Sequence, residues 1–141
     1  MTGQLSEHFW RGEFACRCRE CGFDTVDAEL INGPLSFLRT DNVRVTILSG
    51  CRCLEHNETV QREANPDYVP YSSKSIHMTG KAADIRVERR EGRVWVIVPP
   101  DEVATALERR YPDKYGIGRY KTFTHIDVRA DRTSTRLNSR H

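Results

Sequence analysis

The stretch Ser75-Ile-His-Met-Thr-Gly-Lys-Ala-Ala-Asp84 places an imidazole seven residues before a carboxylate. Both groups are ligands for a borderline metal ion such as zinc. Glycine and alanine lie between them, so the backbone could approach a bound ion closely. The spacing would put both groups on one face of a helix, but Gly80 disfavours a continuous helix. We therefore expect His77 on a loop and Asp84 at the start of a strand over residues 83–87.

A second stretch supplies a third candidate ligand. Phe123-Thr-His-Ile-Asp-Val-Arg129 alternates apolar and polar residues, which is typical of a half-buried strand. We expect its imidazole, His125, to complete a three-ligand metal site with His77 and Asp84. Three protein ligands leave a fourth position for water, as catalytic zinc sites require.

The pattern Ser75-x-His77-x-x-Gly80-x-Ala82-x-Asp84, followed later in the chain by His125, resembles the zinc D-Ala-D-Ala carboxypeptidases, a family of murein peptidases. The resemblance runs from about residue 9 to residue 129 and is closest to small phage and prophage members. It implies the hedgehog/DD-peptidase fold, a Zn²⁺ cofactor and hydrolysis of peptidoglycan stem peptides, by a D-Ala-D-Ala carboxypeptidase or a related endopeptidase. The alternative is a non-catalytic, zinc-stabilised binding or phage structural module of the same fold.

The resemblance also covers Phe14-Ala-Cys-Arg-Cys18 and Ser49-Gly-Cys-Arg52. In the family an arginine after Ser-Gly lies beside the metal, where it stabilises the substrate carboxylate or the developing oxyanion. Arg52 is the candidate for this role, because a planar guanidinium offers paired hydrogen bonds. A surface ion pair is the other interpretation. Ser75 is a second candidate for substrate binding, although a plain loop cap is an equal alternative.

The general base is the least defined part of the site. In relatives an acid or a histidine commonly precedes the last metal ligand, whereas residues 122–124 are Thr-Phe-Thr here. Asp127 is the candidate catalytic residue instead, because positions i and i+2 of a strand share a face. It could also hold the ring of His125 in place. Swapped roles, with His125 as base and Asp127 as ligand, remain open.

Composition restricts the class of protein. A chain of 141 residues predicts one domain, and 38% hydrophobic with 30% charged residues is typical of a globular protein. The formal net charge of +2 disfavours a dedicated nucleic-acid binder.

The first residues do not show the basic segment followed by an apolar run that is typical of a signal peptide, and no apolar stretch is long enough to span a membrane. We therefore expect a monomer with no nucleic-acid or membrane partner. We expect synthesis in the cytoplasm without a signal peptide, and action at the cell wall only after separate delivery.

Five cysteines form two clusters, Cys16-x-Cys18-x-x-Cys21 and Cys51-x-Cys53. An odd number cannot all pair within one molecule. Disulfide bonds, thiolates around a structural metal ion, and reduced buried thiols are the three interpretations. We favour disulfide bonds or buried thiols that pack around the N-terminal loop over a second zinc site, because the spacings between the cysteines only partly match ribbon-type zinc sites. No neighbouring histidine or lysine marks a nucleophilic cysteine.

The remaining sequence predicts an α+β fold over residues 1–129, a zinc peptidase-like domain. In the first half we expect a helix from Asp27 that is split at Gly33-Pro34, a strand over 43–48, and mostly loop over 54–74 with one helical turn at most. In the second half we expect a hairpin that turns at Glu91-Gly92 and returns over 94–98, a helix from Pro99 that Pro112 ends, and a second hairpin over 115–129. Helices followed by antiparallel strands imply a single small antiparallel sheet with helices packed on one side. The tail, 130–141, should be disordered, and it resembles translated sequencing-adapter read-through, so it is a candidate non-native segment.

Overall fold

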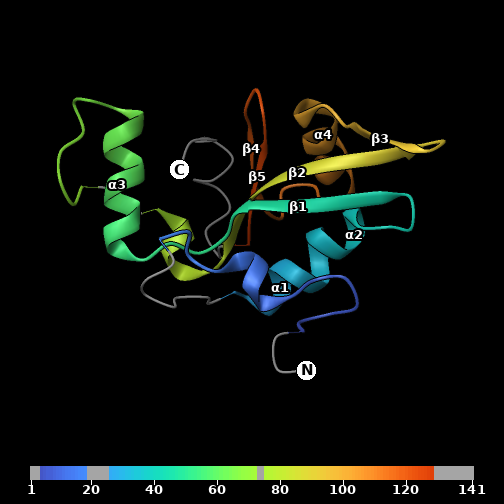
Figure 1. Cartoon of the computed structure of the whole chain (residues 1–141), viewed down its shortest axis with the longest axis horizontal. Helices are drawn as coiled ribbons and strands as arrows, with labels where there is room; N and C mark the ends of the chain where they lie inside the picture. Colours follow the sequence, from blue (N-terminus) through green and yellow to red (C-terminus); the bar gives the residue numbers. More distant parts are fainter. Residues whose placement is uncertain (1–3, 19–25, 73–74, 129–141) are drawn as a thin grey trace.

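The computed structural model describes residues 4–18, 26–72 and 75–128 (Figure 1). Its elements, in chain order, are η1 (Arg11–Phe14), α1 (Ala28–Leu30), η2 (Ile31–Leu35), α2 (Ser36–Leu38), β1 (Val43–Ser49), α3 (Leu54–Ala64), η3 (Ile76–Thr79), β2 (Ala82–Glu91), β3 (Val94–Ile97), α4 (Pro100–Arg110), β4 (Gly116–Arg119) and β5 (Thr124–Asp127). The expected disordered tail and Cys21 lie outside the described residues. Among the described segments, every helix is too short or too polar to span a bilayer.

The long strand β2 is the centre of one antiparallel sheet in the order β1-β2-β5-β4, with β3 also paired to β2. Strand β1 lies along one edge of β2. The other edge is shared, because β5 pairs with the first residues of β2 and β3 pairs with its last ones. This arrangement brings the start of β2 between β1 and β5, where the candidate ligands lie.

The two faces of the sheet differ in polarity. Side chains on one face form the hydrophobic core together with residues of η1, α1, η2 and α4. The strands contribute Val45, Ile47, Ala83, Ile85, Val87 and Ile126, and Val128, directly after β5, joins them. Since successive side chains of a strand point to opposite faces, Asp84, His125 and Asp127 lie on the other face. The fold is therefore α+β with one sheet and its core helices packed on one side, which confirms the expectation.

The helix that begins after Asp27 is interrupted as the sequence predicts. The Asp27 side chain caps it by accepting a hydrogen bond of 2.8 Å from the Glu29 amide. A π-helical turn, η2, then separates α1 from α2, and Pro34 lies within it. Proline has no amide hydrogen and its ring crowds the preceding turn, so a regular helix cannot continue through it.

The expectation of mostly loop over residues 54–74 was wrong, because residues 54–64 form the helix α3. Its buried side chains are polar, Asn57 and Glu58, so the apolar periodicity that marks most helices is absent. Cys53 is its N-cap and accepts a hydrogen bond of 3.4 Å from the His56 amide. In Figure 1, α3 stands at one end of the sheet, away from the helices that cover the core.

Candidate metal centre

His77 lies in the short 3₁₀ helix η3 and is fully buried. Ser75 caps this helix, since its hydroxyl accepts a hydrogen bond of 3.2 Å from the His77 amide. Gly80 ends it in the left-handed conformation with φ of 73°, which favours glycine. The Nδ1 atom of His77 lies 2.7 Å from the carbonyl oxygen of Gly50. A carbonyl can only accept, so Nδ1 carries the proton and Nε2 is the nitrogen available to a metal.

Asp84 and His125 face each other across paired strands. They are register partners on β2 and β5, and the distance from Asp84 Oδ1 to His125 Nδ1 is 3.0 Å. The same carboxylate oxygen lies 3.3 Å from His77 Nε2. One ligand atom from each of the three residues lies within 4.8 Å of the other two, and all three side chains are buried. The fold thus brings together three groups that the sequence places on separate elements.

The charges at this cluster suit a cation. Burial lowers the pKa of His77 from 6.5 to about 4, although Asp84 opposes the shift. The imidazole is therefore neutral at pH 7, and its Nε2 lone pair faces a carboxylate oxygen. Two acceptors 3.3 Å apart repel each other, and a cation between them would relieve that repulsion.

His125 lies between two carboxylates. Burial disfavours its charged form, but hydrogen bonds with Asp127 and Asp84 outweigh burial and raise its pKa. Its Nε2 atom is 2.9 Å from Asp127 Oδ2, and its Nδ1 atom faces Asp84. The surroundings that favour a proton on this ring would also favour a divalent cation at Nδ1.

Asp127 is almost fully buried, and its position depends on Gly116 in the neighbouring strand β4. A Cβ atom at position 116 would lie 2.6 Å from both carboxylate oxygens of Asp127, which is too close for any side chain. Only glycine at this register position leaves room for the carboxylate that contacts His125.

Arg52 is buried beside the cluster and is not a surface residue, being 3% exposed. Its Nη2 atom lies 3.7 Å from Asp84 Oδ2. Its Nη1 donates to Asn57 Oδ1 at 3.1 Å, and its Nε donates to Ser49 Oγ at 3.4 Å. Sequence reasoning did not identify Asn57 as the residue that orients the guanidinium, because nothing in a polar stretch singles out one amide.

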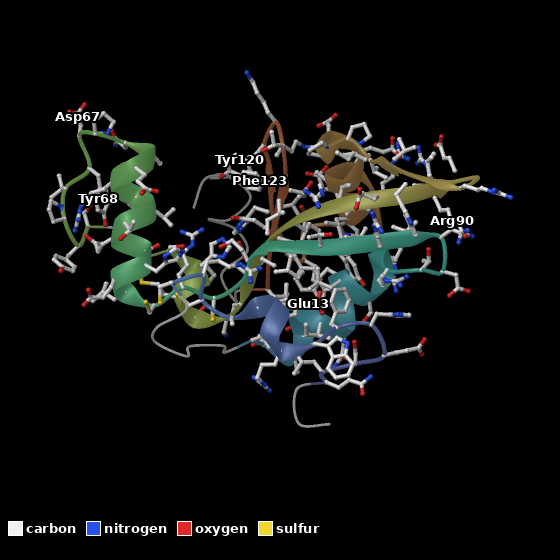
Figure 2. All side chains as sticks on the ribbon, in the orientation of Figure 1. Glu13, Asp67, Tyr68, Arg90, Tyr120 and Phe123 are labelled. Carbon is white, nitrogen blue, oxygen red and sulfur yellow. The ribbon has the colours of Figure 1, made fainter. Side chains whose placement is uncertain are left out.

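The segment after α3 folds back against that helix. Glu58 accepts hydrogen bonds from the Tyr68 hydroxyl at 2.6 Å and from the Tyr71 amide at 2.7 Å. Figure 2 shows Tyr68 beside α3, and it shows Tyr120 and Phe123 together at the turn between β4 and β5. Those two rings stack with centroids 4.5 Å apart.

Comparison with known proteins adds one finding. A family model described as Peptidase M15 matches residues 7–127 of the chain. No curated protein and no solved structure matches it. The matched span contains the whole cluster of His77, Asp84, His125, Asp127 and Arg52.

Proposed function

The chain belongs to the Peptidase M15 family, and from this membership we propose that it is a zinc peptidase acting on peptidoglycan. It hydrolyses peptide bonds in the peptide stems, as a D-Ala-D-Ala carboxypeptidase or a related endopeptidase. The observation that carries the proposal is the convergence of His77, Asp84 and His125 beside a buried arginine. Two imidazoles and a carboxylate suit zinc and leave a coordination position open, as hydrolytic zinc sites require.

The residues that hold the metal use defined atoms. His77 would bind the metal through Nε2, because its Nδ1 donates to the Gly50 carbonyl, and His125 would bind through Nδ1, because its Nε2 donates to Asp127. Asp84 supplies a carboxylate oxygen between the two rings. When bound, the ion supplies Lewis-acid activation of a water molecule and of the scissile carbonyl.

Asp127 serves as a positioning residue in this proposal. Its carboxylate accepts a hydrogen bond from the Nε2–H of His125, which keeps Nδ1 deprotonated and directed at the metal. Its exposure of 1% favours this role over that of a general base that must exchange protons with solvent.

Arg52 binds the substrate. Asn57 and Ser49 hold the guanidinium, and its remaining N–H groups are available to a substrate carboxylate or to the developing oxyanion. Ser75 contributes by capping the helix that carries His77.

A non-catalytic, metal-stabilised module is the second candidate function. Two observations favour it: the three candidate ligands are between 0% and 6% exposed, and no acid occupies residues 122–124 before His125. Digestion of purified muropeptides, read by mass spectrometry with and without added zinc, separates the two functions. We expect zinc-dependent loss of terminal D-Ala or cleavage within the stem. A folded protein that holds zinc at His77 and leaves every muropeptide intact would be the non-catalytic module.

Substitution of Asp127 by asparagine tests its role in the same assay. If Asp127 is a positioning residue, the variant should bind zinc roughly 10–100-fold more weakly, and saturating zinc should largely restore its turnover. If Asp127 is the general base, the zinc affinity of the variant should be unchanged and its turnover should fall by a factor of ~10²–10⁴. A zinc affinity and a turnover both equal to those of the parent would exclude both roles.

A further inference from the structure

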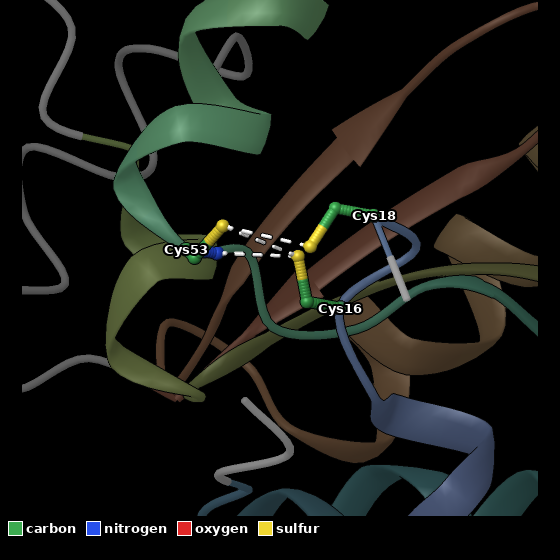
Figure 3. Close-up of side chains that lie close together, drawn as sticks. All are labelled: Cys16, Cys18 and Cys53. Carbon is green, nitrogen blue, oxygen red and sulfur yellow. Dashed lines mark hydrogen bonds between the residues drawn. The ribbon is translucent and has the colours of Figure 1, made fainter. Parts of the chain in front are cut away.

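Three cysteine sulfurs from two distant parts of the chain meet beside the N-terminus of α3 (Figure 3). Cys16 and Cys18 follow η1, whereas Cys53 is the N-cap of α3. The Sγ atoms of Cys16 and Cys53 lie 3.7 Å apart, and those of Cys18 and Cys53 lie 3.9 Å apart. All three sulfurs lie within 4.8 Å of one another.

We propose that Cys16, Cys18 and Cys53 bind a structural zinc ion, in addition to the ion of the active site. A disulfide bond joins its sulfurs at about 2.05 Å, so neither measured pair is covalently joined. Thiolates around a tetrahedral zinc ion, at about 2.3 Å each, lie about 3.8 Å from one another. The two measured distances match this second geometry.

The backbone around the cluster supports thiolates. The Cys53 amide donates a hydrogen bond of 3.4 Å to Cys16 Sγ, and the His56 amide donates one of 3.4 Å to Cys53 Sγ. Cys53 also lies at the N-terminus of an eleven-residue helix, whose dipole favours negative charge. Cys16 is 5% exposed and burial raises the pKa of its thiol, so a thiolate there would need a cation beside it.

The position of the cluster gives the ion a function. The ion would join the segment that carries Cys16 and Cys18 to the loop of residues 50–53, which contacts the proposed active site. In this loop the Gly50 carbonyl fixes the His77 ring, and Arg52 reaches Asp84. The two segments already touch, since the Cys51 amide donates to the Phe14 carbonyl at 2.9 Å, and a Cβ at Gly50 would lie 2.6 Å from Phe14 atoms.

Metal analysis and cobalt spectroscopy of the full chain test the proposal. The zinc-loaded parent should contain one more ion per chain than the variants Cys16→Ser and Cys53→Ser. Cys51→Ala is the matched control, because it removes a buried thiol from the same loop outside the cluster, and it should keep the parent's metal content. Cobalt-loaded parent should show thiolate-to-cobalt charge-transfer absorption, which Cys53→Ser loses.

The same measurements separate this site from the proposed active site. In His77→Ala the charge-transfer band should remain while one ion is lost, so a failed peptidase assignment would leave the thiolate result unaffected. If the serine variants do not fold, the cobalt spectrum of the parent protein alone tests the proposal. Cobalt-loaded parent without a thiolate band overturns the proposal. Peptide mapping that shows a disulfide between Cys16 and Cys53 in metal-replete protein overturns it too.

Discussion

The His–Asp cluster and the cysteine cluster are built in different ways. Asp84 and His125 are partners on hydrogen-bonded strands, and Gly116 in the next strand leaves room for the carboxylate behind them. The cysteines sit on a segment after η1 and at a helix N-cap, where no strand ladder fixes their separation. Asp84 and His125, on paired strands, should keep their relative positions without an ion, whereas the separation of the three cysteines depends on what their side chains bind.

Arg52 connects the two clusters. It lies next to Cys53 in the sequence, its amide donates to the His77 carbonyl at 3.1 Å, and its guanidinium faces Asp84. A disturbance of the cysteine cluster should therefore reach the peptidase site through Arg52, while the paired strands remain in place.

Asp84→Ala should have the strongest effect. Without this carboxylate the active-site ion should be lost, and peptide hydrolysis should fall by about 10³-fold or more, since metal activation contributes several kcal/mol. Metal content and muropeptide turnover measure this, with Asp67→Ala as an exposed control. Asp84 is not a member of the cysteine cluster, so the cobalt band of that cluster should persist in the variant. Simultaneous loss of both ions would show that metal binding by the cysteines depends on Asp84.

Arg52→Lys should have the next largest effect. A lysine keeps the charge but not the planar set of donors that Asn57 and Ser49 hold, so kcat/KM should fall by ~10²–10³ while the fold and the zinc content stay unchanged. Arg44→Lys, the same exchange at an exposed ion pair between β1 and β2, is the matched control. Equal kcat/KM values in the two variants would remove Arg52 from the substrate site.

Acidification should destabilise the metal-free protein through His77. Its folded pKa of about 4 lies below 6.5, so the unfolded chain binds more protons between these values. The free energy of unfolding should therefore fall as the pH drops from about 6.5 to about 4, by up to about 3 kcal/mol. His125 has a raised pKa, so its contribution is complete below 6.5 and is lost only at higher pH.

Urea unfolding at several pH values measures this slope, and the difference between the parent and His77→Gln isolates it. His8→Gln, on the surface segment before η1, should retain the slope. A His77→Gln variant that loses as much stability on acidification as the parent would show that the ring is not held neutral.

The smallest effect is expected for Gly116→Ala. The added Cβ would lie 2.6 Å from the Asp127 carboxylate and displace it from His125, so zinc affinity at the strand site should weaken by roughly 10-fold. Gly12→Ala adds a methyl group with nothing within 4 Å and should have no effect. Competition with a chelating dye measures the affinity. Unchanged affinity in Gly116→Ala would mean that Asp127 does not support the metal.

Most of the fold could be predicted from local patterns. The strands of β1, β2 and β5 have alternating side chains, and Pro34, Gly92 and Pro100 mark where the chain must break, turn or start a helix. The helix α3 could not be predicted this way. Helix prediction relies on an apolar stripe, and the buried side chains of α3 are an amide and a carboxylate whose partners lie elsewhere in the chain.

The order of residues alone predicts the chemical groups of the site: two imidazoles and a carboxylate at spacings that point to a metal, an arginine after Ser-Gly, and strand alternation that puts His125 and Asp127 on one face. Which atoms meet depends on how distant segments of the chain fold together. The Gly50 carbonyl selects the tautomer of His77, Asn57 orients Arg52, and a missing Cβ at Gly116 admits a buried carboxylate. Each of these three contacts depends on an atom or on empty space that another segment of the chain contributes. Local sequence patterns do not predict such contacts.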